Sequence, residues 1–128
     1  MADEPCPFCT ISGDRVLHEG GLVKAIWDAY PVSPGHVLII PRRHVANWFD
    51  VSCEEQSEML GAIQQVRRIL DEQFAPSGYN IGMNVGAAAG QTVSHFHLHV
   101  IPRYAGDVAD PTGGIRNVIP GKANYRGK

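Results

Sequence analysis

Three of the six histidines in this chain alternate with apolar residues late in the sequence. The run reads His95-Phe96-His97-Leu98-His99-Val100. A period of two is typical of a half-buried β-strand, because successive side chains of a strand point to opposite faces. We therefore predict a strand that carries three imidazoles on one face and packs its apolar face against a core. A neutral imidazole is a nucleophile near pH 7, so this face could perform covalent chemistry.

A segment of small residues, positions 84–94, leads directly into the histidine run. Its alanines and glycines would let backbone N–H groups approach an anion closely, and successive amides can surround phosphate oxygens. The segment lacks the Gly-Lys-Ser/Thr of a P-loop and precedes a strand instead of a helix. An ordinary turn is the alternative interpretation. The position beside three histidines favours a phosphate site.

A second candidate site begins at the pair Cys6-X-X-Cys9. Two thiolates at this spacing can chelate one side of a tetrahedral zinc ion. A pair of buried reduced thiols and a redox pair are the alternatives. The redox interpretation is disfavoured because the motif does not follow a strand and start a helix. The chain has three cysteines, an odd number that argues against a disulfide framework.

Short β-like runs should build the sheet around the histidine run. Runs at 15–18 and 22–27 flank Gly20-Gly21, which predicts a hairpin. Residues 36–40 predict a strand stopped by Pro41, and residues 79–85 alternate apolar side chains with asparagine and glycine. Prolines at 31 and 34 predict a loop over 28–35.

One amphipathic helix is predicted from Ser52, which forms a capping-box pattern with Glu55. Apolar residues then recur at steps of three and four as Met59, Leu60, Ile63, Val66, Leu70 and Phe74. The helix should end at 75–78. Several strands around a single long helix favour a mainly antiparallel α+β domain over a doubly wound one.

Length, net charge and hydropathy limit the kinds of partner that this chain can have. A length of 128 residues predicts one domain over 1–128, with a core at about 6–103 and an irregular tail at 104–128. A formal net charge of -2 gives no general surface for nucleic acid, and no apolar run approaches the roughly 20 residues that span a membrane. The acidic start shows no secretory signal, so a cytoplasmic protein is expected.

Beyond these features, the sequence resembles the histidine triad (HIT) superfamily. The motif His-φ-His-φ-His-φ-φ, with φ an apolar residue, matches positions 95–101. Further residues similar to those of HIT sequences are Asp28, Pro31, Gly35-His36, Pro41-Arg42-Arg43-His44, Asn84, Gly90-Gln91-Thr92-Val93 and Pro102-Arg103. The tail, with Gly106-Asp107 and Gly113-Gly114-Ile115-Arg116, resembles the Fhit-like side of the superfamily more than the Hint-like side.

The resemblance implies a HIT-like fold, in which one long helix and a short helix pack on a mainly antiparallel five-stranded sheet. It also implies a two-fold homodimer whose sheets join. The middle histidine, His97, would attack the α-phosphorus of a nucleotide and form a covalent nucleotidyl-histidine. His99 would contact the phosphate, and His36 would orient the array. A hydrogen-bonded structural histidine is the alternative for each of these two.

The resemblance further implies which residues bind the nucleotide. Asn84 and Thr92 would touch the phosphate or the leaving group, while Gly90 and the adjacent Gln91 belong to the phosphate loop. Asp28 would accept the ribose hydroxyls, or serve only as a turn residue. The base pocket could be lined by apolar residues of the hairpin, including Ile26 and Trp27.

Some bacterial HIT proteins are similar in binding zinc through such a cysteine pair, the histidine after Pro-X-X and the first histidine of the triad. That similarity assigns Cys6, Cys9, His44 and His95 to one zinc ion. Four protein ligands leave no open position, so the zinc would be structural. His95 would then act in catalysis only as a fixed neighbour of His97.

The function expected from these features is hydrolysis or transfer at the α-phosphorus of a purine nucleotide conjugate. Diadenosine polyphosphates are the first candidates, and nucleoside phosphoramidates or adenylates are the second. The transferase relatives carry glutamine where this chain has His99, which favours a hydrolase. The alternatives are a non-catalytic, zinc-stabilised nucleotide-binding protein and a catalytic zinc site built from the three histidines.

Overall fold

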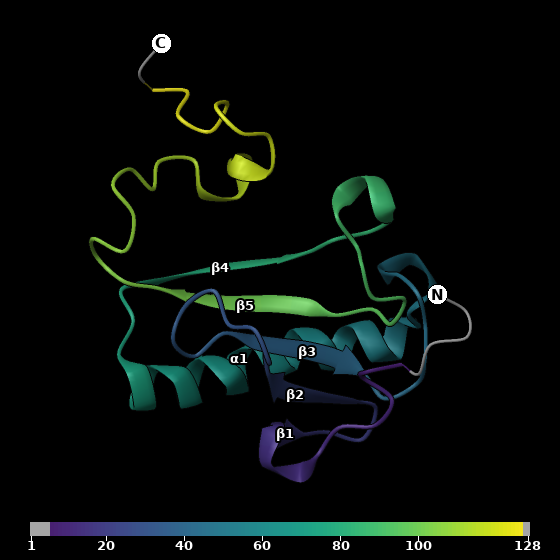
Figure 1. The fold of residues 1–128 in the computed structure, drawn as a ribbon. Helices are drawn as coiled ribbons and strands as arrows, with labels where there is room; N and C mark the ends of the chain where they lie inside the picture. The colour runs from purple at the N-terminus through teal and green to yellow at the C-terminus, as the bar shows by residue number, and fades with distance from the viewer. Residues whose placement is uncertain (1–5, 127–128) are drawn as a thin grey trace.

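A computed structural model describes residues 6–126 and shows a five-stranded sheet (Figure 1). The strands are β1 (Val16–Glu19), β2 (Val23–Trp27), β3 (Val37–Pro41), β4 (Gly78–Met83) and β5 (Leu98–Arg103). Their order in the sheet is β1-β2-β3-β5-β4, and every neighbouring pair is antiparallel. The predicted α+β class is therefore confirmed.

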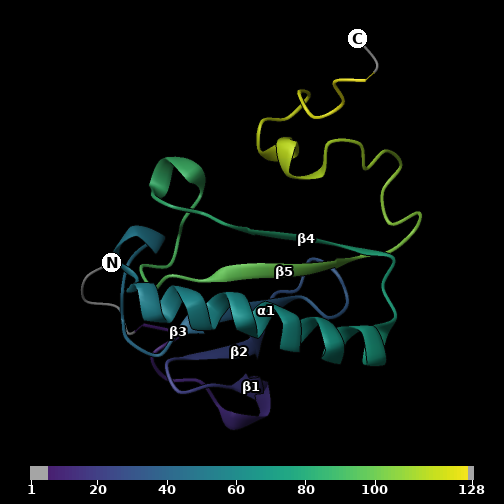
Figure 2. The same cartoon turned by 180° about the vertical axis from the view of Figure 1, so that it is seen from behind.

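A single long helix, α1 (Cys53–Phe74), covers one face of the sheet (Figure 2). The predicted capping box is confirmed, because Ser52 accepts a hydrogen bond from Glu55 N–H and returns its own N–H to the Glu55 carboxylate. The buried side chains of α1 pack on the inward residues of β2, β3 and β5. These core residues include Met59, Ala62, Val66, Leu70, Val37, Ile39, Phe96, Leu98 and Val100.

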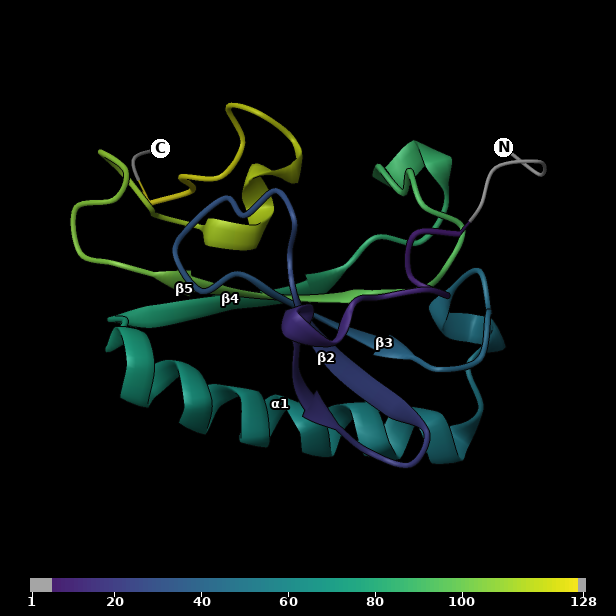
Figure 3. The ribbon, with the colours of Figure 1, turned by 60° about the horizontal axis from the view of Figure 1, so that its bottom comes forward.

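The opposite face of the sheet carries loops in place of a second long helix (Figure 3). Three segments lie on this side, namely the N-terminal loop, the loop at 28–36 and the loop at 84–97. The C-terminal tail lies on the same side and contacts β4 through the 3-10 helix η4 (Gly114–Val118). The family resemblance also implies a short second helix, but α1 is the one α-helix of residues 6–126. The other helical segments, η4 among them, are short 3-10 helices. The loops around the histidines therefore gather on the face that α1 leaves open.

The prediction that all three histidines lie within one strand is wrong in part, because β5 begins only at Leu98. Continuing the register between β3 and β5 would place Pro41 opposite Phe96. Proline has no N–H to donate, so the ladder stops there. The Pro41 carbonyl instead accepts a hydrogen bond from Nε2 of His95, at 2.8 Å. The alternation of faces is nevertheless confirmed, since Phe96 is fully buried under α1 while His97 lies on the open face.

Within residues 6–126, no helix is both long and apolar enough to cross a membrane.

Candidate active site and metal centre

The cysteine pair, one loop histidine and the first triad histidine converge on one point. Donor atoms of Cys6, Cys9, His44 and His95 all lie within 4.8 Å of one another. Nδ1 of His95 is 3.3 Å from Sγ of Cys6 and 3.6 Å from Sγ of Cys9, and Nδ1 of His44 is 3.3 Å from Sγ of Cys9. Ordinary Zn–S and Zn–N bonds at tetrahedral angles place such donors about 3.4–3.8 Å apart. The four residues therefore fit a tetrahedral zinc ion.

Hydrogen bonds and burial set the orientation and the protonation of these candidate ligands. The Pro41 carbonyl accepts the Nε2 proton of His95, which leaves the lone pair of Nδ1 directed at the thiols. Burial lowers the pKa of His95, so the ring stays neutral, as metal binding requires. Hydrogen bonding to Cys6 raises the pKa of Cys9, and burial raises it further. A bound divalent cation would stabilise both thiolates.

His97 is held by the backbone of the metal-site residue two positions before it. Its Nδ1 donates to the carbonyl oxygen of His95 at 2.9 Å, which keeps the lone pair on Nε2. Phe8, which lies between Cys6 and Cys9 in the sequence, is buried. Its ring packs edge-on against His97 with 5.1 Å between ring centroids. His95 of the candidate metal site therefore contacts His97 through its backbone carbonyl, and Phe8 packs against both rings.

His36 and His99 form a directed hydrogen-bond chain on the other side of His97. The Val32 N–H donates to Nδ1 of His36 at 3.2 Å, so the proton of the neutral His36 ring is on Nε2. That Nε2 lies 3.0 Å from Nδ1 of His99 and donates to it. The proton of His99 is thereby left on Nε2, where it can be donated to a substrate oxygen.

Burial keeps this pair of rings neutral. It is the main cause that lowers the pKa of His99 from 6.5 to about 4, and the neighbouring His97 and His36 lower it further. Burial also lowers the pKa of His36, although Asp28 opposes the shift. Both rings can therefore act as hydrogen-bond donors of fixed direction at neutral pH.

Asp28 lies beside this chain at the end of β2. One carboxylate oxygen accepts the Tyr30 N–H at 2.8 Å, and the other is 3.4 Å from Nε2 of His36. Donor atoms of Asp28, His36 and His99 lie within 4.8 Å of one another and form a second group, separate from the cysteine cluster. His95 and His99 thus belong to different clusters and His97 to neither, which argues against all three binding one catalytic metal.

Two glycines and one amide side chain determine the conformation of the loop before the triad. Gly86 and Gly90 have φ of 90° and 95°, values that disfavour any larger residue. The Gln91 carboxamide accepts the Gly86 N–H and donates to the carbonyls of Ala46 and Val93. Gln91 therefore closes the loop on itself, a role that its position in the motif did not reveal.

The two remaining loop residues are accessible. Thr92 is exposed and Asn84 is partly buried at the end of β4. Neither side chain has a hydrogen-bond partner among residues 6–126. Both are therefore available to a ligand.

Of the two hairpin residues that could line a base pocket, Trp27 lies on the face away from the histidines. Its ring packs on Phe74 at the C-terminal end of α1, with 6.0 Å between centroids. Strand alternation explains the difference, because Ile26 and Trp27 are adjacent and must point to opposite faces. Ile26 lies on the histidine side, in a cluster with Phe8, Leu38 and Ile40.

Several groups that organise the site were not singled out from the sequence. Phe8 could have been found as the apolar residue inside the cysteine pair. The Val32 N–H and the carbonyls of Pro41 and His95 are backbone groups, which every residue carries, so residue types give no signal for them.

Comparisons with known proteins agree with this geometry. A family model described as HIT domain matches residues 12–106. AP-4-A phosphorylase of Mycobacterium tuberculosis is 37% identical over 108 residues, covering 82% of this chain and 55% of that protein. The asymmetrical bis(5'-nucleosyl)-tetraphosphatase of Schizosaccharomyces pombe is 36% identical over 98 residues, covering 77% of this chain and 54% of that protein. The chain thus spans about half the length of these relatives.

Solved structures show the same fold. A histidine triad nucleotide-binding protein from Sulfolobus tokodaii superposes with a TM-score of 0.74 at 32% identity, covering 80% of this chain and 71% of that one. A zinc-bound histidine triad family protein from Mycobacterium smegmatis gives a TM-score of 0.69 at 34% identity, covering 85% and 73%. From the family match, the relatives and the shared fold together, the chain belongs to the HIT domain family.

Proposed function

We propose that this protein is a nucleotide hydrolase that acts at the α-phosphorus of purine nucleotide conjugates through a covalent intermediate on His97. The observation that carries the proposal is the hydrogen bond from Nδ1 of His97 to the His95 carbonyl, which leaves the Nε2 lone pair free. That nitrogen attacks the α-phosphorus, and the bond from phosphorus to the leaving group breaks. Water then attacks the same phosphorus, the P–N bond breaks, and the nucleoside monophosphate leaves with a proton released.

Hydrogen-bond donors of fixed direction would stabilise the negative charge that develops on the phosphate oxygens. His99 donates from Nε2 because His36 occupies its Nδ1. The backbone N–H groups of Gly86, Ala89, Gly90 and Gln91 already donate within the loop at 84–94. Further donors to the phosphates therefore come from the remaining amides of this loop and from Asn84 and Thr92, with Gly90 leaving room for the phosphates and Gln91 holding the loop. Asp28 accepts the ribose hydroxyls at the end of β2. An in-line displacement needs positioning and charge stabilisation above all, which these groups supply.

Dinucleoside polyphosphates are the first substrate class to test. The names of the two curated relatives, a phosphorylase and a tetraphosphatase, both refer to dinucleoside tetraphosphate cleavage, and differ in whether phosphate or water accepts the nucleotidyl group. His99 stands where transferase relatives carry glutamine, so we favour water as the acceptor. Assays with and without inorganic phosphate separate the two reactions.

The metal site has a structural role in this proposal. Cys6, Cys9, His44 and His95 fill all four positions around a zinc ion, so no position is left for substrate. The zinc-bound relative from Mycobacterium smegmatis supports the choice of metal. When bound, the ion would fix His95, whose carbonyl directs His97.

The proposed homodimer would form through β4. This strand lies at one end of the sheet, so its outer backbone groups have no partner strand within residues 6–126. Ile81 and Met83 are 41% and 36% exposed on the side of α1, where Leu60 is also exposed. A second copy paired along β4 by a two-fold axis would cover these apolar side chains.

The direct test of function is His97→Ala. The variant should lose measurable turnover of diadenosine tetraphosphate while its circular dichroism and nucleotide binding remain, because the ring supplies the nucleophile and little packing. His18→Ala, which alters a histidine on β1 outside the site, should keep parent activity. Equal rates in His97→Ala and the parent would rule out nucleophilic catalysis by this residue.

A further inference from the structure

The direction of the hydrogen-bond chain through His36 and His99 depends on one backbone N–H. Val32 donates to Nδ1 of His36 at 3.2 Å, so this nitrogen must carry a lone pair. Without that donor, a neutral ring can move its proton to Nδ1, and Nε2 then has none to give to His99. Asp28 supports the present tautomer more weakly, from 3.4 Å. The position of Val32 therefore helps to decide which nitrogen of His99 is protonated.

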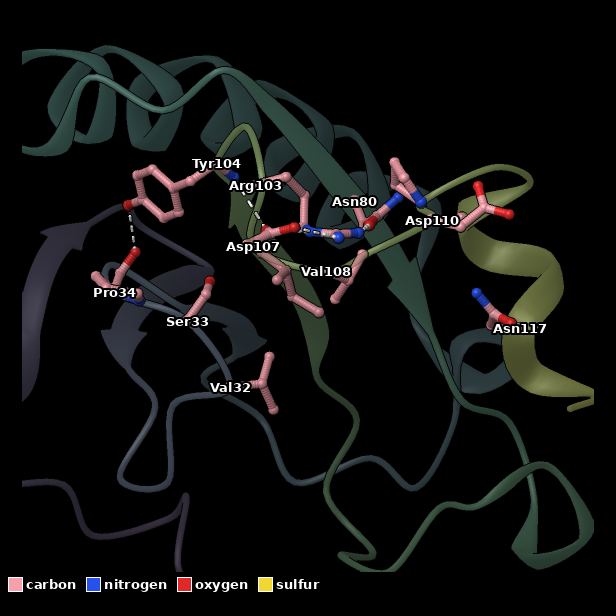
Figure 4. Close-up of a pocket in the computed structure, with 13 residues that line it drawn as sticks. Val32, Ser33, Pro34, Asn80, Arg103, Tyr104, Asp107, Val108, Asp110 and Asn117 are labelled. Carbon is pink, nitrogen blue, oxygen red and sulfur yellow. Dashed lines mark hydrogen bonds and ion pairs between the residues drawn. The ribbon is translucent and has the colours of Figure 1, made fainter. Parts of the chain in front are cut away.

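Packing does little to hold Val32 in place. Its side chain is 71% exposed, and that of Tyr30, two positions earlier, is 88% exposed. Val32 also lines a cavity of about 490 Å³, together with Val108 and Asn117 of the C-terminal tail (Figure 4). The position of the Val32 N–H therefore depends on hydrogen bonds made by the residues next to it.

Two hydroxyl groups hold the residues that follow Val32. The Ser33 hydroxyl donates to the Pro102 carbonyl of β5 at 2.7 Å. The Tyr104 hydroxyl donates to the Pro34 carbonyl, also at 2.7 Å, and Figure 4 shows this ring reaching from the end of β5 to the loop. Both hydrogen bonds fix the loop relative to the strand that carries the last triad histidine.

Tyr104 is itself held by the turn that follows β5. Its N–H donates to the Asp107 carboxylate at 3.0 Å, and the Asp107 N–H donates to the Tyr104 carbonyl at 2.9 Å. Arg103 makes two hydrogen bonds to the same carboxylate, both of 2.8 Å. Gly106 completes the turn with a φ of 82°, a value that favours glycine. The Tyr104 backbone is therefore fixed independently of the loop that its hydroxyl holds.

We infer that Tyr104 and Ser33 are positioning residues for the proposed reaction. They hold the Val32 N–H against His36, and the resulting tautomer of His36 leaves the proton of the last triad histidine on Nε2. The inference rests on the proposed function for the use of that proton, whereas the tautomer itself is a property of the resting protein. The turn at 103–107 thereby acts on the reacting groups without touching the substrate.

Nuclear magnetic resonance of the ring nitrogens tests the inference without any substrate. With isotope-labelled histidine at neutral pH, the parent should show His36 protonated on Nε2 and unprotonated on Nδ1, its signals being assigned by their loss in His36→Asn. The double variant Tyr104→Phe, Ser33→Ala should bring the two nitrogen shifts closer together, because the ring then exchanges between tautomers. Tyr125→Phe and Ser57→Ala, at two exposed residues, are the matched controls and should keep the parent spectrum.

Steady-state kinetics tests the connection to the reaction. The double variant should lower kcat for diadenosine tetraphosphate about tenfold, the low end for outer partners of reacting groups. KM should change little, because a backbone hydrogen bond of 3.0 Å from the Asp28 N–H to the His36 carbonyl holds Asp28 without the hydroxyls. Circular dichroism should match the parent, since Gly35 keeps its close approach to Pro102.

The outcomes separate the inference from the proposed function. An unchanged His36 tautomer in the double variant, or a changed tautomer with the kcat of the parent, would overturn the inference. A parent without turnover, whose variant still shows the tautomer change, would instead refute the proposed function and leave the action of the two hydroxyls on His36 intact. Tyr104→Phe alone removes one oxygen atom and should shift the nitrogen signals in the same direction by less, which keeps the test decisive if the double variant is unstable.

Discussion

At the residue scale, the site depends on which nitrogen of each ring carries a proton. Three backbone or side-chain contacts decide this for His97, His36 and His99. His97 keeps a free lone pair on Nε2, and His99 keeps a free N–H on Nε2. The arrangement thus suits the proposed mechanism, which needs a nucleophile and a hydrogen-bond donor next to each other.

Replacement of His36 tests the hydrogen-bond chain. His36→Asn removes the Nε2–H that occupies Nδ1 of His99, so His99 can adopt the tautomer that no longer donates to phosphate. We expect kcat to fall at least about tenfold with KM little changed, as for other outer partners of reacting groups. Steady-state kinetics on diadenosine tetraphosphate measures this, and His18→Asn is the control. A parent-like kcat in His36→Asn would remove His36 from the mechanism.

Acid should destabilise the fold through His99. Burial lowers the pKa of this ring from 6.5 to about 4, so the unfolded state binds the proton more readily. The resulting stability is complete above pH 6.5 and is lost as the pH falls toward 4. Urea unfolding across this range should show a smaller loss for His99→Gln than for the parent. Metal release in acid affects both proteins alike, so identical losses would contradict the burial of a neutral His99.

Residue types identified much of this site from sequence. The cysteine pair, the triad and His36 come together as their positions in the motif suggested. Two features could not be read from residue types. The sequence left open which hairpin residue faces the histidines, and the structure packs Trp27 on Phe74 of α1. The contacts of Gln91 are made to carbonyls, which no residue type reveals.

At the scale of elements, β3 and the N-terminal segment decide where the histidines lie. The predicted hairpin, the strand ending at Pro41 and the capped helix are confirmed, because glycine pairs, prolines and capping boxes act locally. The late start of β5 was not predicted, since it depends on a cross-strand pairing with Pro41. The interruption lets His95 turn toward the cysteines while His99 stays in the sheet.

Removal of one thiol tests the metal site. Cys6→Ser should lose the one zinc ion per chain that the parent holds, because three ligands remain and the tetrahedral set is incomplete. Thermal unfolding should occur at a lower temperature, since binding energy at a structural site is folding energy. Elemental analysis of purified protein gives the metal content, and Cys53→Ser, at an exposed cysteine of α1, is the control. A parent that contains no zinc, or a variant that keeps it, would refute the site.

At the scale of the whole molecule, the sheet separates two kinds of surface. One face is covered by α1, and the other carries the N-terminal loop, the loop at 84–97 and the C-terminal tail (Figure 3). β4 is the edge strand at one end of the sheet. An edge strand with exposed apolar side chains is the natural place for a second copy to join.

A charge on this edge should prevent association. Ile81→Arg places a cation where the proposed two-fold axis would bring two copies together, so light scattering should give the mass of a monomer while the parent gives that of a dimer. Val118→Arg, on an exposed residue of η4, should remain dimeric. A monomeric parent, or an unaffected variant, would contradict pairing through β4.

The covalent intermediate on His97 is the central claim, and intact-mass spectrometry tests it most directly. The protein is mixed with excess diadenosine tetraphosphate, denatured at alkaline pH at times from milliseconds onward, and weighed. We predict one adenylyl adduct per chain in the parent and in His18→Asn, with none in His97→Ala. Turnover by the parent with no adduct at any time, or the same adduct in His97→Ala, would contradict the mechanism.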